Sequence, residues 1–312
     1  MNRKFISLFA AVALLASLAV SCGEKDGPEG QGGDTPELVG GFDATGASNS
    51  LFSVSPKKQV RFSRGNLQYH CTFDAWRFAE TQYKCLLDSN NAVSPDYMGW
   101  IDLFGFGTSS WDGGAIAYMP YSTDVTDTNY WAGGEYSNGL VEEFADADWG
   151  YHNPIHDGGN VPKQWRTLSR DEWRYLFGDS EKRAGKWGFA VIDDKHHGVV
   201  VLPDKWTAPE GISFSEGYID SVSTENKYSS SEWGKLEAAG AIFLPAAGSR
   251  NAASTSGGTT GTYWSVSYRN RTESYCLYFN GSGNGIMETS HAIARHMGLA
   301  VRLVRDNSSS KK

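Results

Sequence analysis

Near its C-terminal end the chain reads Thr262-Tyr263-Trp264-Ser265-Val266-Ser267-Tyr268, a run of aromatic, β-branched and hydroxyl-bearing residues. Aromatic and β-branched side chains are enriched in β-strands. Comparable runs lie before and after it: Ala241-Ile242-Phe243-Leu244-Pro245, Tyr275-Cys276-Leu277-Tyr278-Phe279 and Gly298-Leu299-Ala300-Val301-Arg302-Leu303-Val304. Because Gly, Asn and Ser bound these runs, we predict strands, separated by polar loops at residues 269–274 and 280–296. Strands that frame long loops form a scaffold that presents a surface.

The first half of the chain also favours short strands. Phe52 and Val54 alternate with other residues toward Val60-Arg61-Phe62, which predicts a strand pair with its turn at residues 55–58. The other strands expected before residue 240 are residues 76–78, 189–192 and 198–203. Residues 113–138 are polar, rich in Gly and Tyr and without a clear period, so we expect a long loop there.

Helix signals are few. Ser169-Arg170-Asp171-Glu172 has the spacing of a capping box, in which the serine and glutamate side chains bond each other's backbone amides. Apolar residues at helical spacing follow at residues 173–177, so we predict a short helix with its aromatic side chains in the core. Ser229 or Ser230 is expected to begin a second short helix. The predicted fold class is therefore α+β, with mostly short β-strands, a few short helices and long loops.

The N-terminus has the pattern of a targeting segment. Arg3 and Lys4 precede an apolar run at residues 5–20 that is short and rich in Ala for a membrane span. Small residues then precede Cys22, which is what a lipoprotein signal peptidase requires, because the thiol is lipidated and becomes the new N-terminus. We predict a lipoprotein signal peptide at residues 1–21 and lipidation of Cys22. Ordinary secretory cleavage with an unmodified cysteine is the alternative.

Residues 22–50 are rich in Gly, Asp, Glu and Pro and hold almost no bulky apolar residues, which predicts a flexible tether. The charged cluster at residues 24–26 resembles the export signal that places some Gram-negative lipoproteins outside the outer membrane; a plain soluble linker is the alternative. We expect an outer-membrane lipoprotein exposed at the cell surface, attached to the membrane through its N-terminal lipid only. One folded domain is expected at residues 51–305, followed by a polar tail at residues 306–312.

Charge and cysteine content exclude several classes of protein. The formal net charge of −8 disfavours nucleic-acid binding, because phosphates require a basic face. Cys71 and Cys85 are candidates for a disulfide, whereas Cys276 alternates within a strand-like run and is predicted to be a buried apolar side chain. No zinc-ligand spacing links the cysteines. His152 and His156 have a spacing that suits a metal site on a helix, but Pro154 lies between them, so we predict two loop histidines and no metal site.

Taken together, several phrases resemble the C-type-lectin-like fold group. Upstream they are Arg61-Phe62-Ser63-Arg64-Gly65-Asn66-Leu67-Gln68-Tyr69, Gly99-Trp100-Ile101-Asp102-Leu103-Phe104-Gly105 and Trp165-Arg166-Thr167-Leu168-Ser169, and downstream they are the C-terminal runs. The chain is similar to bacterial cell-surface lipoproteins in the broad group that holds formylglycine-generating enzymes and the variable receptor proteins of diversity-generating retroelements. The resemblance covers residues 52–304 and implies a C-type-lectin-like domain. It implies less about activity, because function resides in sites built on a fold.

Two activities of the fold group are not expected. The formylglycine-generating branch handles oxygen with a cysteine pair near the C-terminus, but only Cys276 lies in that region here, and the flanking motif is absent. The chain also lacks a Gly-x-Ser-x-Gly elbow, a phosphate-binding loop and a His-Glu-x-x-His pair, so we predict no catalytic residues and no cofactor. Animal C-type lectins bind calcium through Glu-Pro-Asn or Gln-Pro-Asp followed by Trp-Asn-Asp, and neither motif occurs. Sugar binding through aromatic stacking stays open.

The predicted function is non-catalytic recognition of an extracellular protein or carbohydrate through the C-terminal loops. These loops combine Tyr and Arg with Asn, Ser and Gly, the composition of a binding paratope. In the retroelement-diversified relatives the same segment carries the variable positions. The predicted anchors are Tyr263, Trp264, Tyr268, Arg269, Asn270 and Arg271, and the predicted rim is Asn284, His291 and His296. The alternatives are solvated loops without a ligand, an enzyme or degenerate enzyme of the formylglycine-generating type, and a structural subunit of a surface assembly.

Overall fold

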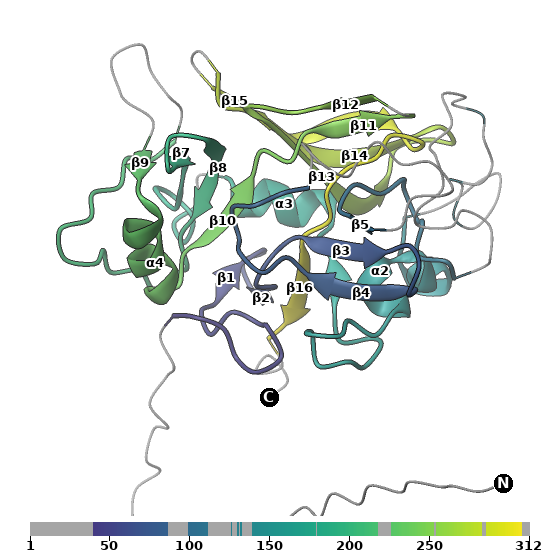
Figure 1. The fold of residues 1–312 in the computed structure, drawn as a ribbon, viewed down its shortest axis with the longest axis horizontal. Helices are drawn as coiled ribbons and strands as arrows, with labels where there is room; N and C mark the ends of the chain where they lie inside the picture. The colour runs from purple at the N-terminus through teal and green to yellow at the C-terminus, as the bar shows by residue number, and fades with distance from the viewer. Residues whose placement is uncertain are drawn as a thin grey trace, which may run out of the picture. The chain divides into compact units, whose positions relative to one another are not determined.

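The computed structural model describes residues 40–86, 99–111, 126, 130, 132, 139–178, 180–217, 226–252, 254–282 and 285–307. Its elements are mostly strands with a few short helices, which confirms the α+β class (Figure 1). The predicted loop at residues 113–138, the signal peptide and Cys22 lie outside the described residues, apart from three isolated positions in the loop. Among the described residues, no helix combines the length and the apolar character that crossing a membrane requires.

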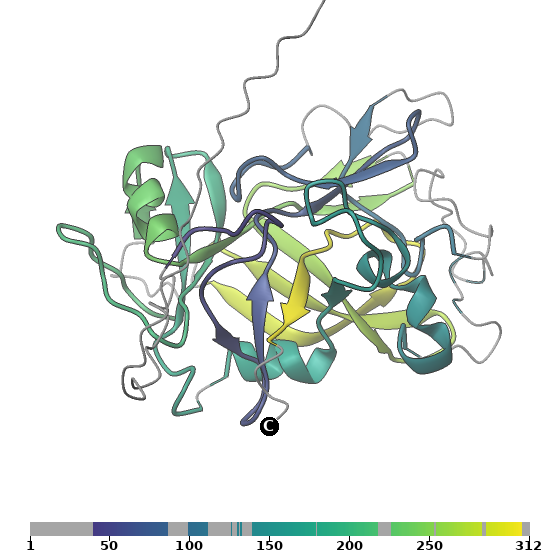
Figure 2. The same ribbon diagram turned by 90° about the horizontal axis from the view of Figure 1, so that it is seen from below.

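One sheet joins the beginning of the folded part to its end. Its order is β1 (Phe52–Ser53), β2 (Gln59–Phe62), β16 (Leu303–Asp306) and β6 (Arg166–Thr167), and all pairs are antiparallel. The predicted strand pair is confirmed, with Phe52 opposite Val60. Figure 2 shows the yellow C-terminal strand beside the purple-blue N-terminal one.

A second sheet carries the longer of the two capped helices. Its order is β10 (Ile242–Pro245), β8 (His196–Val201), β7 (Trp187–Ile192) and β9 (Asn226–Tyr228), in which only the pair β7–β9 is parallel. α4 (Ser230–Ala238) follows β9 and buries Trp233 and Leu236 against this sheet. Ser229, one of the two residues predicted to begin this helix, caps α4 with a complete capping box.

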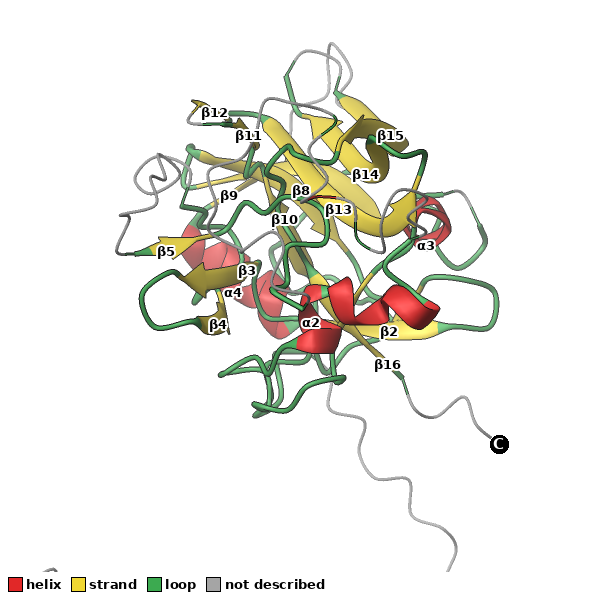
Figure 3. Cartoon of the chain, turned by 90° about the vertical axis from the view of Figure 1, so that its right-hand side faces the viewer, coloured by secondary structure: helices red, strands yellow, loops and turns green. Residues whose placement is uncertain are grey.

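The third sheet contains two of the C-terminal runs, residues 262–268 and 275–279. It consists of β13 (Thr260–Tyr268), β14 (Glu273–Asn280) and β15 (Ile286–Ala294), all antiparallel (Figure 3). α3 (Arg170–Leu176) packs against it and begins with the predicted capping box, in which Ser169 Oγ accepts from the Glu172 amide at 3.2 Å. The remaining elements are β3 (Leu67–His70), β4 (Ala75–Phe78), β5 (Trp100–Ile101), β11 (Ser249–Asn251), β12 (Ser254–Ser256), the 3-10 helix η2 (Glu142–Ala147) and α2 (Trp149–His152).

Two hydrophobic clusters cover opposite faces of the third sheet. Successive side chains of a strand point to opposite faces. Trp264 and Cys276 accordingly belong to one cluster, and Tyr263, Leu277 and Phe279 to the other. The middle of β13 is therefore part of the core, and only its end reaches solvent.

Three boundaries differ from the sequence-based expectations. Residues 286–294, predicted as part of a polar loop, form β15, because a strand that is paired on one edge and open to solvent on one face needs few apolar side chains. Of the run at residues 298–304 only its last two residues belong to β16, while residues 298–300 form isolated bridges to other segments. β16 itself continues to Asp306, inside the predicted tail.

Residues 40–50, predicted as the last part of a flexible tether, belong to the folded part. Ala47 is fully buried and pairs with Ser63. The Ser48 amide donates to the Phe62 carbonyl at 2.8 Å, and Arg61 Nη1 donates to the carbonyls of Ser48 and Asn49 at 3.0 and 2.9 Å. Backbone hydrogen bonds hold most of this segment, with Phe42 as its one bulky apolar side chain packed against a hydrophobic cluster, and a composition rule does not detect such bonds.

Candidate functional site

The end of β13 lines a hollow of about 380 Å³. Tyr268, the last residue of β13, is 43% exposed at its rim. Tyr275 of β14 is half-buried, and the guanidinium carbon of Arg170 lies 4.7 Å from the centre of its ring. Ser267 fixes the start of α3 here, because its hydroxyl accepts from the Arg170 amide at 3.1 Å. Two tyrosines and an arginine therefore meet at this hollow.

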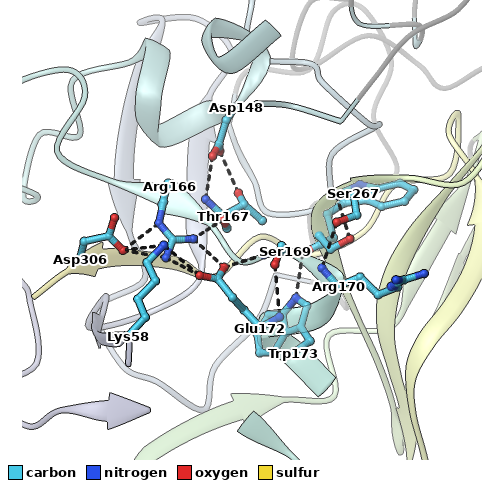
Figure 4. A network of polar contacts seen from close by, with 12 residues as sticks. Lys58, Asp148, Arg166, Thr167, Ser169, Arg170, Glu172, Trp173, Ser267 and Asp306 are labelled. Carbon is cyan, nitrogen blue, oxygen red and sulfur yellow. Dashed lines mark hydrogen bonds and ion pairs between the residues drawn. The ribbon is translucent and has the colours of Figure 1, made fainter. Parts of the chain in front are cut away.

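A second hollow, of about 370 Å³, holds a network of charges (Figure 4). Arg166 donates to both oxygens of Glu172 at 2.7 and 2.8 Å and to Asp306 at 2.7 Å. Lys58 Nζ lies 3.1 Å from Glu172 and 3.4 Å from Asp306. Burial alone would raise the pKa of Glu172, but the hydrogen bonds and charge of Arg166 outweigh it and lower that pKa. The charges of this network compensate one another, because two cations face two carboxylates.

Asp148 is the buried carboxylate of the second hollow. Its two oxygens accept from the amide and the hydroxyl of Thr167 at 2.7 and 2.8 Å. Burial is the largest influence and raises the pKa of Asp148 to about 6, against the opposing effect of these hydrogen bonds. Perturbed carboxyl groups occur at functional sites, and they also occur in structural networks. Here both oxygens hold β6 in place.

The two hollows share Val141, Ser169 and Val266. We call the surface that they form together the β13–α3 groove. Its wall at residues 139–141 is attached to β13, because the Leu140 amide donates to the Val266 carbonyl at 2.8 Å. Val141 is 44% exposed between the hollows. The groove thus has the apolar Val141 side chain at its centre, with tyrosines on one side and paired charges on the other.

The turn after β13 carries four of the predicted anchors, which are exposed: Tyr268, Arg269, Asn270 and Arg271. We call residues 268–273 the β13–β14 tip. Asn270 points into the turn, where its side-chain oxygen accepts from the amides of Thr272 and Glu273, each at 2.9 Å. Asn270 Nδ2 and Arg269 Nη1 both donate to Glu273 Oε2, at 2.8 and 3.1 Å. Asn270 is therefore a turn-forming residue more than a contact residue.

Two predicted anchors were wrong, because Tyr263 and Trp264 are fully buried. The Tyr263 hydroxyl donates to the Pro245 carbonyl at 2.7 Å, and Trp264 Nε1 donates to the Phe104 carbonyl at 2.6 Å. Both faces of β13 are covered at this level, so neither side chain reaches a ligand on the surface. The same holds for the predicted rim residue His296, which is 5% exposed.

The structure places the predicted rim residue His291 away from the tip. His291 lies opposite Cys276, whereas Tyr268 lies opposite Ser274, so they occupy different levels of the sheet. The His291 ring stacks on Tyr278 at 4.9 Å, and its Nδ1 lies 2.7 Å from Glu288 Oε2. Asn284 lies outside the described residues.

The cysteines and histidines that the structure describes form neither a disulfide nor a metal-ligand cluster. Cys71 and Cys85 pack against different hydrophobic clusters, and no disulfide joins them. Cys276 is buried as predicted, and burial raises the pKa of its thiol. α2 ends at His152, so His156 does not share its helix. No group of three or more metal-ligating side chains occurs among the residues that the structure describes.

Sequence reasoning missed most of the groove. Its residues come from distant parts of the chain, namely Lys58, Val141, Asp148, Arg166, Arg170, Glu172, Tyr275 and Asp306. The capping box placed Glu172 at the start of a helix, but it gave no sign of the ion pair with Arg166. The predicted strand at residues 275–279 did not show which face of the sheet the Tyr275 side chain lies on.

Comparison with protein-family models, with curated proteins and with solved structures finds no match to this chain. The function proposed below therefore rests on the residues themselves.

Proposed function

We propose that the chain is a non-catalytic recognition protein that binds an extracellular protein or glycan through the β13–β14 tip and the adjoining β13–α3 groove. The observation that carries this proposal is the exposed Tyr268 ring at the rim of a hollow that also holds Tyr275 and Arg170. Tyrosine offers a large contact area at low cost in conformational entropy, and Tyr and Arg are enriched among residues that dominate binding free energies.

The surroundings of the titratable groups support a non-catalytic role. The charges of the second hollow are already bonded to one another. Burial keeps the Cys276 thiol protonated at neutral pH, whereas reactive cysteines need a stabilised thiolate. The alternatives of a formylglycine-generating type of enzyme and of a structural subunit of a surface assembly gain no specific support from these contacts.

The proposal includes a C-type-lectin-like fold and a place at the cell surface. Trp264 and Arg302, which belong to the phrases that carry the resemblance, are fully buried, as is expected of residues that specify a fold. The targeting pattern at residues 1–21 and Cys22 support a lipid anchor in the outer membrane, and the anchor is the only membrane contact that we propose. Mass spectrometry of the mature N-terminus tests the anchor: an unmodified Cys22 contradicts it.

Probing a glycan array and a panel of purified extracellular proteins with the folded domain tests the function. The wild-type domain is expected to bind a defined subset. A variant with Tyr268→Ala, Arg269→Ala and Arg271→Ala is expected to lose at least about tenfold in affinity, because truncating dominant interface residues costs 1 kcal/mol or more each. Phe73→Ala is a matched control, since Phe73 is 75% exposed on the β3–β4 hairpin. Undiminished binding by the triple variant would place the ligand elsewhere.

A further inference from the structure

A buried arginine just beyond the end of β15 supports the β13–β14 tip. Arg295 is 1% exposed. Its Nη2 donates to the Asn270 carbonyl at 2.9 Å, its Nε to the Glu273 carbonyl at 3.4 Å, and its backbone amide to the Thr272 carbonyl at 3.0 Å. Three carbonyls of one turn therefore accept from a single residue.

The same arginine is fixed from behind by the core. Its guanidinium carbon lies 4.9 Å from the centre of the Phe106 ring, and its own carbonyl accepts from the Phe106 amide at 2.9 Å. Phe106 belongs to the first hydrophobic cluster, together with Trp264. Arg295 thus joins the exposed turn to the rigid interior through hydrogen bonds and a cation–π contact.

A guanidinium in this position costs free energy unless its N–H groups are bonded. Burial lowers the pKa of Arg295 to about 10, so the group remains charged at neutral pH. Lysine could supply the charge but not two donors held in a planar fork, which makes arginine the residue suited to bind two carbonyls of one turn.

We infer that Arg295 is a positioning residue for the β13–β14 tip: it holds the backbone of residues 270–273 in one conformation and so presents Tyr268 and Arg271. The tip's role in binding rests on the proposed function, whereas its rigidity does not. The three hydrogen bonds from Arg295 to the tip go to backbone carbonyls, so exchanging the side chains of Thr272 or Glu273 leaves these acceptors in place. A preordered loop binds with less cost in entropy than one that is ordered by its ligand.

Native-state proteolysis tests the inference without a ligand. Trypsin cleaves after Arg269 and Arg271, and cleavage requires the turn to open. In Arg295→Lys we expect cleavage at these two bonds to be at least tenfold faster than in the wild type, as measured by mass spectrometry of the fragments. The protein used is the whole mature chain.

Arg183→Lys is the matched control. Arg183 is also fully buried, and it donates to the carbonyls of Leu176 and Leu202, far from the tip in sequence. This variant is expected to lower stability without selective cleavage at the tip. Equal acceleration at Arg269 and Arg271 in the two variants, after correction for their unfolding free energies, would show a general loss of stability and overturn the inference.

A measurement on the wild type covers the case in which Arg295→Lys does not fold. The amides of Thr272, Glu273 and Arg295 donate within or to the turn, so we expect them to exchange with solvent as slowly as interior amides of β14. Exchange at the rate of an open loop would refute a rigid tip. Ligand affinity is measured separately: unchanged affinity despite a loosened tip would contradict the proposed function and leave the positioning role intact.

Discussion

β13 has a buried middle and an exposed end. At Tyr263 and Trp264 both faces of the strand are covered, and each side chain donates its polar hydrogen to a carbonyl of another segment. Four residues later, Tyr268 is 43% exposed and lines the rim of a hollow. Similar aromatic side chains on one strand therefore serve stability in its middle and are available for contact at its end. Coverage by neighbouring segments, and not residue type, separates the two roles.

The largest expected effect is in the buried middle of β13. Trp264→Ala removes a fully buried side chain from the first cluster and leaves the Phe104 carbonyl without this donor. We expect the free energy of unfolding to fall by about 3–5 kcal/mol. Denaturation by urea measures this change. A loss below about 1 kcal/mol would mean that the middle of β13 is not part of the core.

A second effect concerns Asp148 in the β13–α3 groove and depends on pH. The pKa of Asp148 is raised in the folded state to about 6, from an ordinary value of 3.8. Its contribution to stability is therefore fully present below about pH 4 and is lost as pH rises through 6, a change of about 3 kcal/mol.

Asp148→Asn keeps the shape of the side chain and removes the titration. The unfolding free energy of the variant minus that of the wild type should thus become more positive by about 3 kcal/mol between pH 4 and pH 7. Carboxyls whose pKa is lowered, such as Glu172 and Asp306, make stability rise with pH. Both proteins contain them, so their contribution cancels in the difference between the two unfolding free energies. Parallel pH profiles would show that Asp148 is not held in a buried site.

Local sequence patterns predicted the elements that local contacts determine. The capping box of α3, the cap of α4 by Ser229, the β1–β2 pair and the strands β7 and β8 follow from residues within a few positions of one another. β15 was predicted as a loop because many of its residues are polar. In the structure they belong to a strand that has one face open to solvent. Its pairing depends on β14, which the local pattern does not reveal.

The candidate site was predictable only in part. Residues 269–271 of the predicted polar loop are exposed, whereas Glu273 and Ser274 already belong to β14. The assignment of Tyr263 and Trp264 to a ligand surface was wrong because alternation along a strand gives its two faces but not what covers them. The groove depends on long-range packing that brings Lys58 and Asp306 to Glu172, and no local pattern contains that information.

The most direct test of the contrast within β13 is a single variant with two readouts. Tyr268→Ala is expected to change the free energy of unfolding by less than about 0.5 kcal/mol, because the side chain is exposed. The same variant is expected to weaken binding of a ligand identified on the glycan or protein panel by about tenfold or more. Unchanged affinity, or a loss of stability comparable to that of Trp264→Ala, would contradict the account.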